Sequence, residues 1–151
     1  MMSQKVLATN RKAKHEYFLL ETYEAGLVLK GSEIKSIRAG QISLAQAHVT
    51  TDGREIWLVN AHIAPYNEAS RFNHDPLRQR KLLLHGSEIR KLYEKVKQKG
   101  ATIIPLKVYL KEGLAKIEIA LAKGKKHYDK RAEIAKRDAQ REIDRRYKHR
   151  G

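Results

Sequence analysis

Apolar and polar residues along the chain follow patterns that are typical of β-strands. Residues 16–29 (EYFLLETYEAGLVL) are rich in aromatic and aliphatic side chains, and Gly26 interrupts them. This pattern predicts one long strand with a bend or bulge at the glycine. Residues 81–85 (KLLLH) form a short apolar run, which predicts a buried strand.

Two further strand patterns lie at residues 102–110 (TIIPLKVYL) and 114–122 (LAKIEIALA), and a Lys-Glu-Gly turn joins them. In the second run, apolar residues alternate with Lys116 and Glu118, so one face of that strand should contact water. Pro105 interrupts the first run. It predicts an edge position or a bulge, because proline cannot donate a hydrogen bond to a neighbouring strand.

Residues 47–59 (AHVTTDGREIWLV) give the clearest hairpin signal in the chain. Strand-like residues stand on both sides of Asp52-Gly53, a pair that supplies the positive φ angles of a type I′ turn. The stretch therefore predicts two antiparallel strands joined by a two-residue turn.

Two stretches with the spacing of amphipathic helices begin with the same four residues, GSEI. The first covers residues 31–40, and we expect Ser32 to cap it. The second covers residues 86–100, where we expect Ser87 to act as the cap and Gly100 to end the helix. The residues that flank the two GSEI segments do not match, so a duplicated domain is not indicated.

The resulting order of elements is β-α-β-β-β-α-β-β. It predicts a mainly β fold with helices over residues 1–122: a small closed or partly open antiparallel barrel of six strands with two packed helices, a class of which the OB-type barrel is a common member. Many OB barrels bind single-stranded or folded nucleic acid, although a fold alone does not establish a function.

The positive net charge of the chain favours a partner that is anionic. The chain has 151 residues with 32 Lys plus Arg against 17 Asp plus Glu, a net charge of +15. Residues 123–151 alone contain twelve basic and five acidic residues. A field of this size favours phosphate-rich partners or an anionic membrane surface. The uneven distribution predicts a globular body over residues 1–122 and a basic C-terminal tail over residues 123–151.

Several classes of protein are disfavoured by the composition. The chain has no cysteine, which excludes disulfides and thiolate chemistry. Its apolar runs are too short to span a bilayer, and its start lacks the apolar region of a signal peptide. We therefore expect a soluble cytoplasmic protein without a membrane partner.

Signals for catalysis or metal binding are weak. The seven histidines show no HxH, HxxxH or HExxH spacing, so no metal site is expected. Residues 122–128 (AKGKKHY) resemble a phosphate-binding loop only in part, since Lys126 stands where Ser or Thr is required. His127, Asp129 and Lys130 could serve a nuclease, but neighbours in sequence do not face one another on a helix. We expect no enzymatic activity and no cofactor.

Basic residues next to aromatic or apolar ones give a stronger signal. Residues 10–17 (NRKAKHEY) and 78–85 (RQRKLLLH) each place cations beside strand residues. Lys and Arg in such positions can contact phosphates while aromatic side chains or histidine stack on bases. Each cation taken alone is also compatible with an ordinary solvated surface. Together with the net charge, the clusters indicate RNA or DNA binding.

The tail has a thin apolar stripe that recurs every four residues, with alanine at positions 135 and 139, isoleucine at 143 and tyrosine at 147. Acid-first i,i+4 charge pairs favour a helix in this region. The stripe can bury little apolar surface, and isolated helices of this length are marginal in water. We expect a tail that is largely disordered alone and helical on an anionic scaffold, with a helix packed on the barrel as the alternative.

Three stretches carry a resemblance to a known family: residues 10–40 (NRKAKHEYFLLETYEAGLVLKGSEIKSIRAG), 75–85 (DPLRQRKLLLH) and 121–131 (LAKGKKHYDKR). In this order and spacing they resemble the SsrA-binding protein family, also called small protein B. The resemblance covers roughly residues 9–131, whereas the tail matches only in being basic and helix-prone.

The resemblance implies an OB-type barrel that binds the tRNA-like domain of transfer-messenger RNA. The protein would deliver this RNA to ribosomes stalled on messages without a stop codon, for trans-translation. Elongation factor Tu would take part in the delivery complex. The tail would enter the empty decoding site and message channel, and the protein would have no catalytic role.

The resemblance also implies two sets of site residues. On the barrel, the residues on or near the RNA face would be Asn10, Arg11, Lys12, Tyr23, Glu24, Arg80, Lys81, Leu83, His85 and Lys116. At the decoding site and channel they would be Lys123, Lys125, Lys126, Tyr128, Asp129, Lys130, Arg131 and Tyr147. Here the three lysines would contact rRNA phosphates and Tyr128 would stack on a decoding-site base. Some family members have a histidine in place of Tyr128.

Two other functions stay open at this point. A generic RNA chaperone of the OB type would bind many single strands, and it would need exposed aromatic platforms that one Trp and two Phe supply poorly. A nuclease would show metal-dependent cleavage of RNA.

Overall fold

The computed structural model describes residues 4–66 and 73–125. Strands dominate, and short connections join most of them. In chain order the elements are β1 (Lys5–Thr9), α1 (Ala13–Glu16), β2 (Tyr17–Leu27), α2 (Gly31–Arg38), β3 (Ile42–Ser43), β4 (His48–Thr51), β5 (Ile56–Val59), β6 (His62–Ile63), β7 (Arg80–Leu83), α3 (Gly86–Lys99), β8 (Thr102–Lys111) and β9 (Leu114–Gly124).

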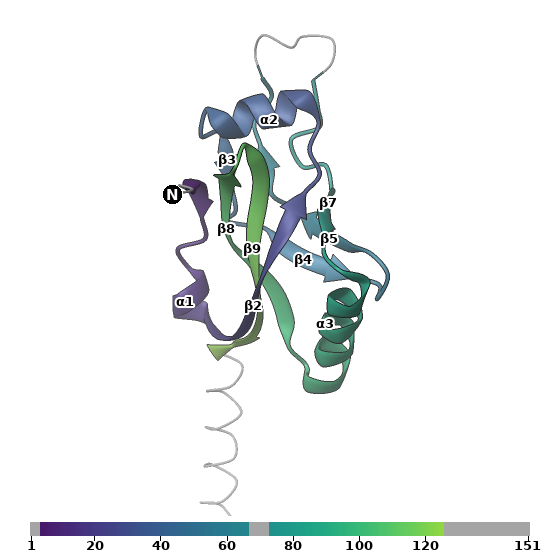
Figure 1. Cartoon of the computed structure of the whole chain (residues 1–151). Helices are drawn as coiled ribbons and strands as arrows, with labels where there is room; N and C mark the ends of the chain where they lie inside the picture. The colour runs from purple at the N-terminus through teal and green to yellow at the C-terminus, as the bar shows by residue number, and fades with distance from the viewer. Residues whose placement is uncertain (1–3, 67–72, 126–151) are drawn as a thin grey trace, which may run out of the picture.

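Strand pairing closes the main sheet into a ring. The order β8-β4-β5-β7-β2-β9 returns to β8, because β9 also pairs with β8 from one end of β8 to the other, and every pairing is antiparallel. These six strands are the six that the sequence predicts (Figure 1). β1 adds to the second half of β8 outside the ring, and β3 and β6 form a separate two-stranded sheet.

Side-chain alternation produces the barrel core, as the sequence predicts. Ile117, Ile119 and Leu121 of β9 point inward and are at most 2% exposed. Two residues of α3, Ile89 and Leu92, belong to the same apolar cluster, so α3 contributes to the interior. Burial of these side chains is the main stabilising contribution to the barrel.

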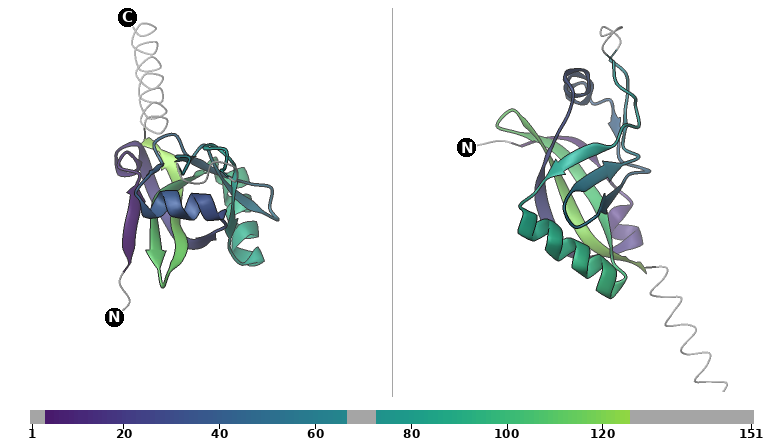
Figure 2. Two further views of the ribbon diagram at one scale, coloured as in Figure 1. Left: turned by 90° about the horizontal axis from the view of Figure 1, so that it is seen from above. Right: turned by 90° about the vertical axis from the view of Figure 1, so that its right-hand side faces the viewer.

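A second, smaller apolar cluster lies on the outside of the barrel, on the side of the sheet away from the core. Ala13 of α1 packs against Ile104, Ala120 and Ala122. The helices α1 and α3 accordingly lie on opposite sides of the β8–β9 pair (Figure 1, Figure 2). Because α1 covers the second half of β9 on the outside, only the first half, with Lys116, remains open on that face.

The turns and bulges differ in part from the predictions. The turn between β4 and β5 has four residues instead of two, since Thr51 pairs with Ile56, and only Gly53 in it has a positive φ. The carboxylate of Asp52 accepts hydrogen bonds from the backbone N–H groups of residues 54 and 55, which stabilises this longer turn. The irregularity in β2 lies between residues 19 and 21, not at Gly26, whereas the bulge predicted at Pro105 is present.

The two predicted N-cap residues, Ser32 and Ser87, are wrong. The N-cap residues are Lys30 for α2 and His85 for α3, and neither caps through its side chain. Ser32 lies inside α2, and its hydroxyl group forms a 2.9 Å hydrogen bond with Nδ1 of His74. Gly100 does end α3, with a left-handed backbone conformation. Four short elements were not predicted: β1, α1, β3 and β6.

Candidate nucleic-acid interface

Four predicted RNA-binding residues meet in one surface pocket. Glu24, Leu83, His85 and Lys116 come from β2, β7, the start of α3 and β9, and all four line the pocket. Gly26 lies at its centre, opposite Leu83 on one neighbouring strand and Lys116 on the other. A Cβ atom at Gly26 would lie 3.2 Å from the Cβ of Leu83, so the missing side chain keeps this part of the surface hollow.

Glu24 is held as an ionised acceptor in this pocket. The hydroxyl group of Tyr109 donates a hydrogen bond to its carboxylate, and the ammonium group of Lys111 lies 3.5 Å away. These contacts lower the pKa of Glu24, with the Tyr109 hydroxyl as the largest cause. An ionised carboxylate at the surface can accept hydrogen bonds from ribose hydroxyls or base amino groups, as no lysine can.

Tyr109 and two neighbouring lysines were missed by the sequence analysis. Lys107, Tyr109 and Lys111 alternate along β8, and the residues paired with them place all three on the same outer face as Lys116. Burial, and then the contact with Glu24, raises the pKa of Tyr109. Its phenol therefore stays protonated and continues to donate. The alternation in residues 107–111 was the available signal for this set.

A second group of predicted residues lies next to the first. Asn10 and Arg11 line a neighbouring pocket together with Lys107 and Glu118. Glu118 pairs in register with Glu24 on one side and with Lys107 on the other, so the two pockets share one continuous surface. We call the outer surface of β7, β2, β9 and β8, with the turn before α1, the outer face.

The three residues of that turn have different roles. The backbone N–H group of Asn10 donates to the carbonyl of Leu106 at 2.7 Å, and its side-chain amide donates to the carbonyl of Pro105 at 3.0 Å. Asn10 thereby fixes the turn to the bulge in β8. Arg11 and Lys12 are exposed, and their cations can reach a ligand.

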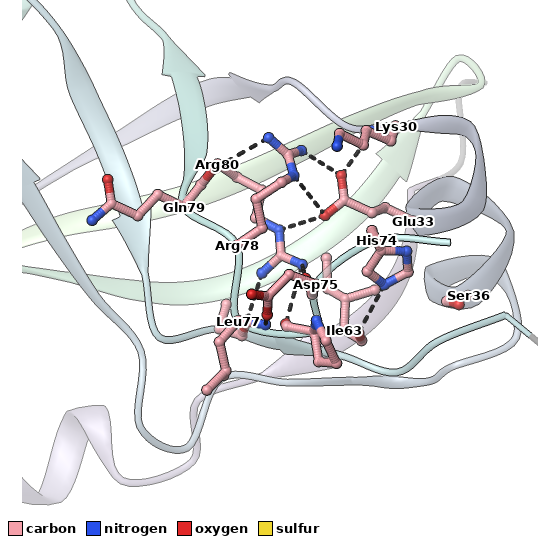
Figure 3. A network of polar contacts seen from close by, with 12 residues as sticks. Lys30, Glu33, Ser36, Ile63, His74, Asp75, Leu77, Arg78, Gln79 and Arg80 are labelled. Atoms are coloured by element: carbon pink, nitrogen blue, oxygen red, sulfur yellow. Dashed lines mark hydrogen bonds and ion pairs between the residues drawn. The ribbon is translucent and has the colours of Figure 1, made fainter. Parts of the chain in front are cut away.

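Arg80 does not lie on the outer face, contrary to the position on or near the RNA face that the resemblance implied for it. Its side chain is fully buried. Its guanidinium group donates to the carboxylate of Glu33 at 2.7 Å and to the carbonyl of Ala61 at 2.6 Å. Figure 3 shows Arg78 and Arg80 converging on Glu33 of α2. Because the whole guanidinium group is buried, it does not reach a ligand at the surface.

Glu33 connects α2 with the segment before β7. Burial by itself would raise the pKa of this carboxyl group, but the hydrogen bonds from Arg78, the backbone of Lys30 and Arg80 lower it overall. His74 adds a second connection, because its ring nitrogens contact the hydroxyl of Ser32 and the carbonyl of Ile63, both at 2.9 Å. This network fixes the position at which β7 enters the barrel.

Tyr23 also lies apart from the pocket. It alternates with Glu24 along β2 and packs against the barrel core. Its hydroxyl group donates to Glu21 at 2.6 Å, and burial, followed by this contact, raises its pKa to about 12. Glu21 in turn forms an ion pair with Lys95 of α3, so this group of residues connects β2 with α3.

The predicted decoding-site residues fall only partly within the described chain. Lys123 lies at the end of β9 and Lys125 directly follows the strand, where its ammonium group donates to the carbonyl of Lys14 at 2.8 Å. That ammonium group also lies 5.2 Å from the ring centroid of Phe18. The remaining six, Lys126, Tyr128, Asp129, Lys130, Arg131 and Tyr147, lie outside the described residues.

Residues 4–66 and 73–125 offer neither a metal site nor a membrane-spanning helix. Within these ranges, no three His, Asp or Glu side chains come together in a way that could hold a metal ion. The helices of this part of the chain are all too short or too polar to cross a membrane.

Comparison with known proteins identifies the family. The family model described as SmpB protein matches residues 7–149. The chain belongs to the SmpB protein family. An SsrA-binding protein from Desulforudis audaxviator is 58% identical over 142 residues, which are 94% of this chain and 93% of that protein. One from Geobacillus thermodenitrificans is 54% identical over 146 residues, 97% of this chain and 94% of the relative.

The SmpB fold is also found among solved structures. A chain described as "tmRNA-SmpB: a journey to the center of the bacterial ribosome" is 51% identical, with a TM-score of 0.65. The match covers 78% of this chain and 82% of the solved one. Membership of the SmpB family thus agrees with the resemblance seen in the sequence, and with the mainly β fold.

Proposed function

We propose that this chain binds the tRNA-like domain of transfer-messenger RNA and delivers it to stalled ribosomes for trans-translation. Its family, the names of its relatives and its net charge of +15 support this function. The observation that carries the proposal is the pocket in which Glu24, Leu83, His85 and Lys116 meet on the outer face.

The chemistry of the outer face suits a folded RNA. Lysine ammonium groups at positions 107, 111 and 116, and the guanidinium group of Arg11, offer charges to phosphates. The fixed carboxylate of Glu24 accepts hydrogen bonds from ribose or base groups, which phosphate-binding cations cannot do. Leu83, 56% exposed, offers an apolar contact for the face of a sugar or base. The combination provides both charge attraction and directional contacts.

The proposal extends to the ribosome. Lys123, Lys125 and the residues from 126 onward would contact the decoding site and the message channel, while the outer face holds the RNA. Elongation factor Tu would join the delivery complex, and the place of action would be the cytoplasm. We assign no catalytic step to this chain, because peptide transfer belongs to the ribosome.

Recovery of bound RNA tests the function directly. The full chain should co-purify with one dominant structured RNA that has a tRNA-like end, and sequencing of that RNA would identify it. A broad mixture of unrelated single-stranded RNAs would instead support a generic RNA chaperone of the OB type.

A lysine substitution tests the outer face. Lys116→Ala should weaken binding to a transcript of the tRNA-like domain and should lower the slope of log K against log salt concentration by about 0.7–0.9, the contribution of one phosphate contact. Lys97→Ala is a matched control, because Lys97 is exposed on α3 and its ammonium group lies 5.1 Å from the ring of Tyr93, away from the pocket. Equal affinity and equal slope for the two variants would refute the assignment of Lys116.

A further inference from the structure

The outer surface of the barrel continues beyond the pocket onto β5. Trp57 pairs in register with Thr50 of β4 on one side and with Lys81 of β7 on the other. Its neighbours in the strand, Ile56 and Leu58, are fully buried. Since side chains alternate along a strand, Trp57 points outward, and it belongs to neither apolar cluster. It is half-buried at the surface.

The polar group of Trp57 remains available. Its indole N–H group forms no hydrogen bond with a described residue. In the part of the chain that the structure describes, every fully buried side-chain nitrogen or oxygen has a hydrogen-bond partner. The indole nitrogen has none, so it is not fully buried. A tryptophan that serves only packing usually hides its ring and satisfies its N–H group. Here a large aromatic ring and a free donor both reach the surface of the sheet.

A cation stands directly beside this ring. The ammonium group of Lys81 lies 3.2 Å from the carboxylate of Glu55, and both side chains are more than 40% exposed. Exposed ion pairs of this kind contribute little stability, so a phosphate can replace Glu55 at low cost. Lys81 and Leu83 lie on the same side of β7, and Leu83 lines the pocket with Glu24 and Lys116. The tryptophan is therefore next to the surface that holds RNA in the proposed function.

We propose that Trp57 is a stacking platform for one unpaired nucleotide base, with Lys81 binding the adjacent phosphate. Aromatic rings beside cations on the outer surface of an OB-type barrel are an arrangement that binds single-stranded nucleic acid. The free indole N–H group can donate to a ribose or phosphate oxygen of the same nucleotide. The inference rests on the proposed function for the presence of RNA, and it adds a base contact that lies outside the pocket of Glu24.

The unpaired base could come from the tRNA-like RNA or from ribosomal RNA, because both present the same chemistry. Trp57 is the only tryptophan in the chain, so its fluorescence reports on this position alone. Stacking of a base on the indole ring should quench the fluorescence and protect it from acrylamide. The first titration uses a transcript of the tRNA-like domain, and the second uses ribosomes that lack a message. The titration that produces the quenching identifies the source of the base.

Two substitutions separate stacking from packing. Trp57→Phe keeps an aromatic surface but lacks the indole N–H donor, so its affinity for the RNA that quenches the fluorescence should fall less than that of Trp57→Leu. Trp57→Leu keeps an apolar side chain without a π-face, and it should bind this RNA about five-fold or more weakly, the lower range for loss of one stacked base. Thermal melting of each free variant reports the contribution of Trp57 to stability separately.

The outcomes distinguish this inference from the proposed function. If neither RNA source changes the fluorescence at saturation, Trp57 does not stack on a base and the inference is wrong. It is equally wrong if folded Trp57→Leu binds like the unchanged chain while Lys116→Ala binds weakly, and the proposed function then stands. If the unchanged chain does not bind the tRNA-like transcript at all, the proposed function fails first. Should Trp57→Leu not fold, the fluorescence titrations of the unchanged chain still decide the question, because they report on the ring of Trp57 itself.

Discussion

Arg80 and Lys81 are consecutive cations on β7, and the structure predicts opposite consequences for their substitution. Arg80 is fully buried with Glu33, whereas Lys81 is exposed with Glu55. Methionine at each position removes the charge and keeps a long side chain. We expect Arg80→Met to reduce stability strongly with little effect on the affinity of the folded protein for RNA. Lys81→Met should do the reverse.

The contacts of Arg80 set the size of the effect. Its removal leaves a fully buried carboxylate with one of its two cationic partners, and breaking a buried pair in this way costs about 3–5 kcal/mol. The carbonyls of Ala61 and Pro76 also lose a donor. A loss of this size is a large part of the roughly 5–15 kcal/mol that stabilises a typical domain. At about 2–4 °C for each kcal/mol, the melting temperature should fall by roughly 6–20 °C.

Breaking the exposed ion pair between Lys81 and Glu55 should cost much less unfolding free energy. A solvent-exposed ion pair such as Lys81–Glu55 contributes about 0–1 kcal/mol, so Lys81→Met should melt within a few degrees of the unchanged chain. Its RNA affinity should fall, and the slope of log K against log salt concentration should decrease by about 0.7–0.9.

The two variants are compared by calorimetry of the free proteins and by gel shift with the tRNA-like transcript, at a temperature where both are folded. The reasoning is refuted if Arg80→Met melts like the unchanged chain but loses RNA affinity. That result would mean that Arg80 reaches the surface and that Glu33 does not depend on it. Equal loss of stability in both variants would also contradict the difference in burial.

Two more predictions concern pH and the tail. The partners of Glu33 hold the pKa of its carboxyl group below the ordinary value. The ionised Glu33 therefore contributes its full stabilisation above the pKa of the unfolded chain, and this contribution disappears as the pH falls through the pKa of the folded chain. The loss of unfolding free energy in Glu33→Gln, measured by denaturant titration, should therefore be largest near neutral pH and should shrink below about pH 4; a pH-independent difference would contradict this. Truncation after Arg131 should leave the melting temperature and the affinity for the tRNA-like transcript nearly unchanged but abolish tagging on stalled ribosomes. Normal tagging would show that the tail is dispensable.

The sequence predicts the barrel well because alternation is a local signal. Each of the six strands of the ring shows either a period of two or a short apolar run, and the turn residues mark their ends. The missed strands are short or lie at an edge: β3 and β6 have two residues each, and β1 pairs on one side only. Such elements depend on partners that are distant in sequence, and no local pattern specifies them.

The predicted N-caps and the expected surface position of Arg80 were wrong for a common reason. Ser32 was expected to cap α2, but its hydroxyl group interacts with His74, which is 42 positions away. Arg80 was expected at the surface, and its partner Glu33 is 47 positions away. Long-range polar partners of this kind override the usual preference of Ser for caps and of Arg for water. A weaker local signal existed, since Arg80 is two positions from Leu82 and therefore lies on the same, buried side of the strand.

The buried ion pair between Glu33 and Arg80 also determines which side chains of β7 lie on the outer face. Successive residues of β7 alternate between the two faces, so a shift of one residue in its pairing would place Lys81 and Leu83 in the core and Arg80 in solvent. That shift would leave Glu33 buried without Arg80, which is strongly unfavourable. The pair between Glu33 and Arg80 therefore stabilises the one register of β7 that presents Lys81 beside Trp57 and Leu83 beside Gly26. A buried residue thus determines which side chains of its strand reach the surface.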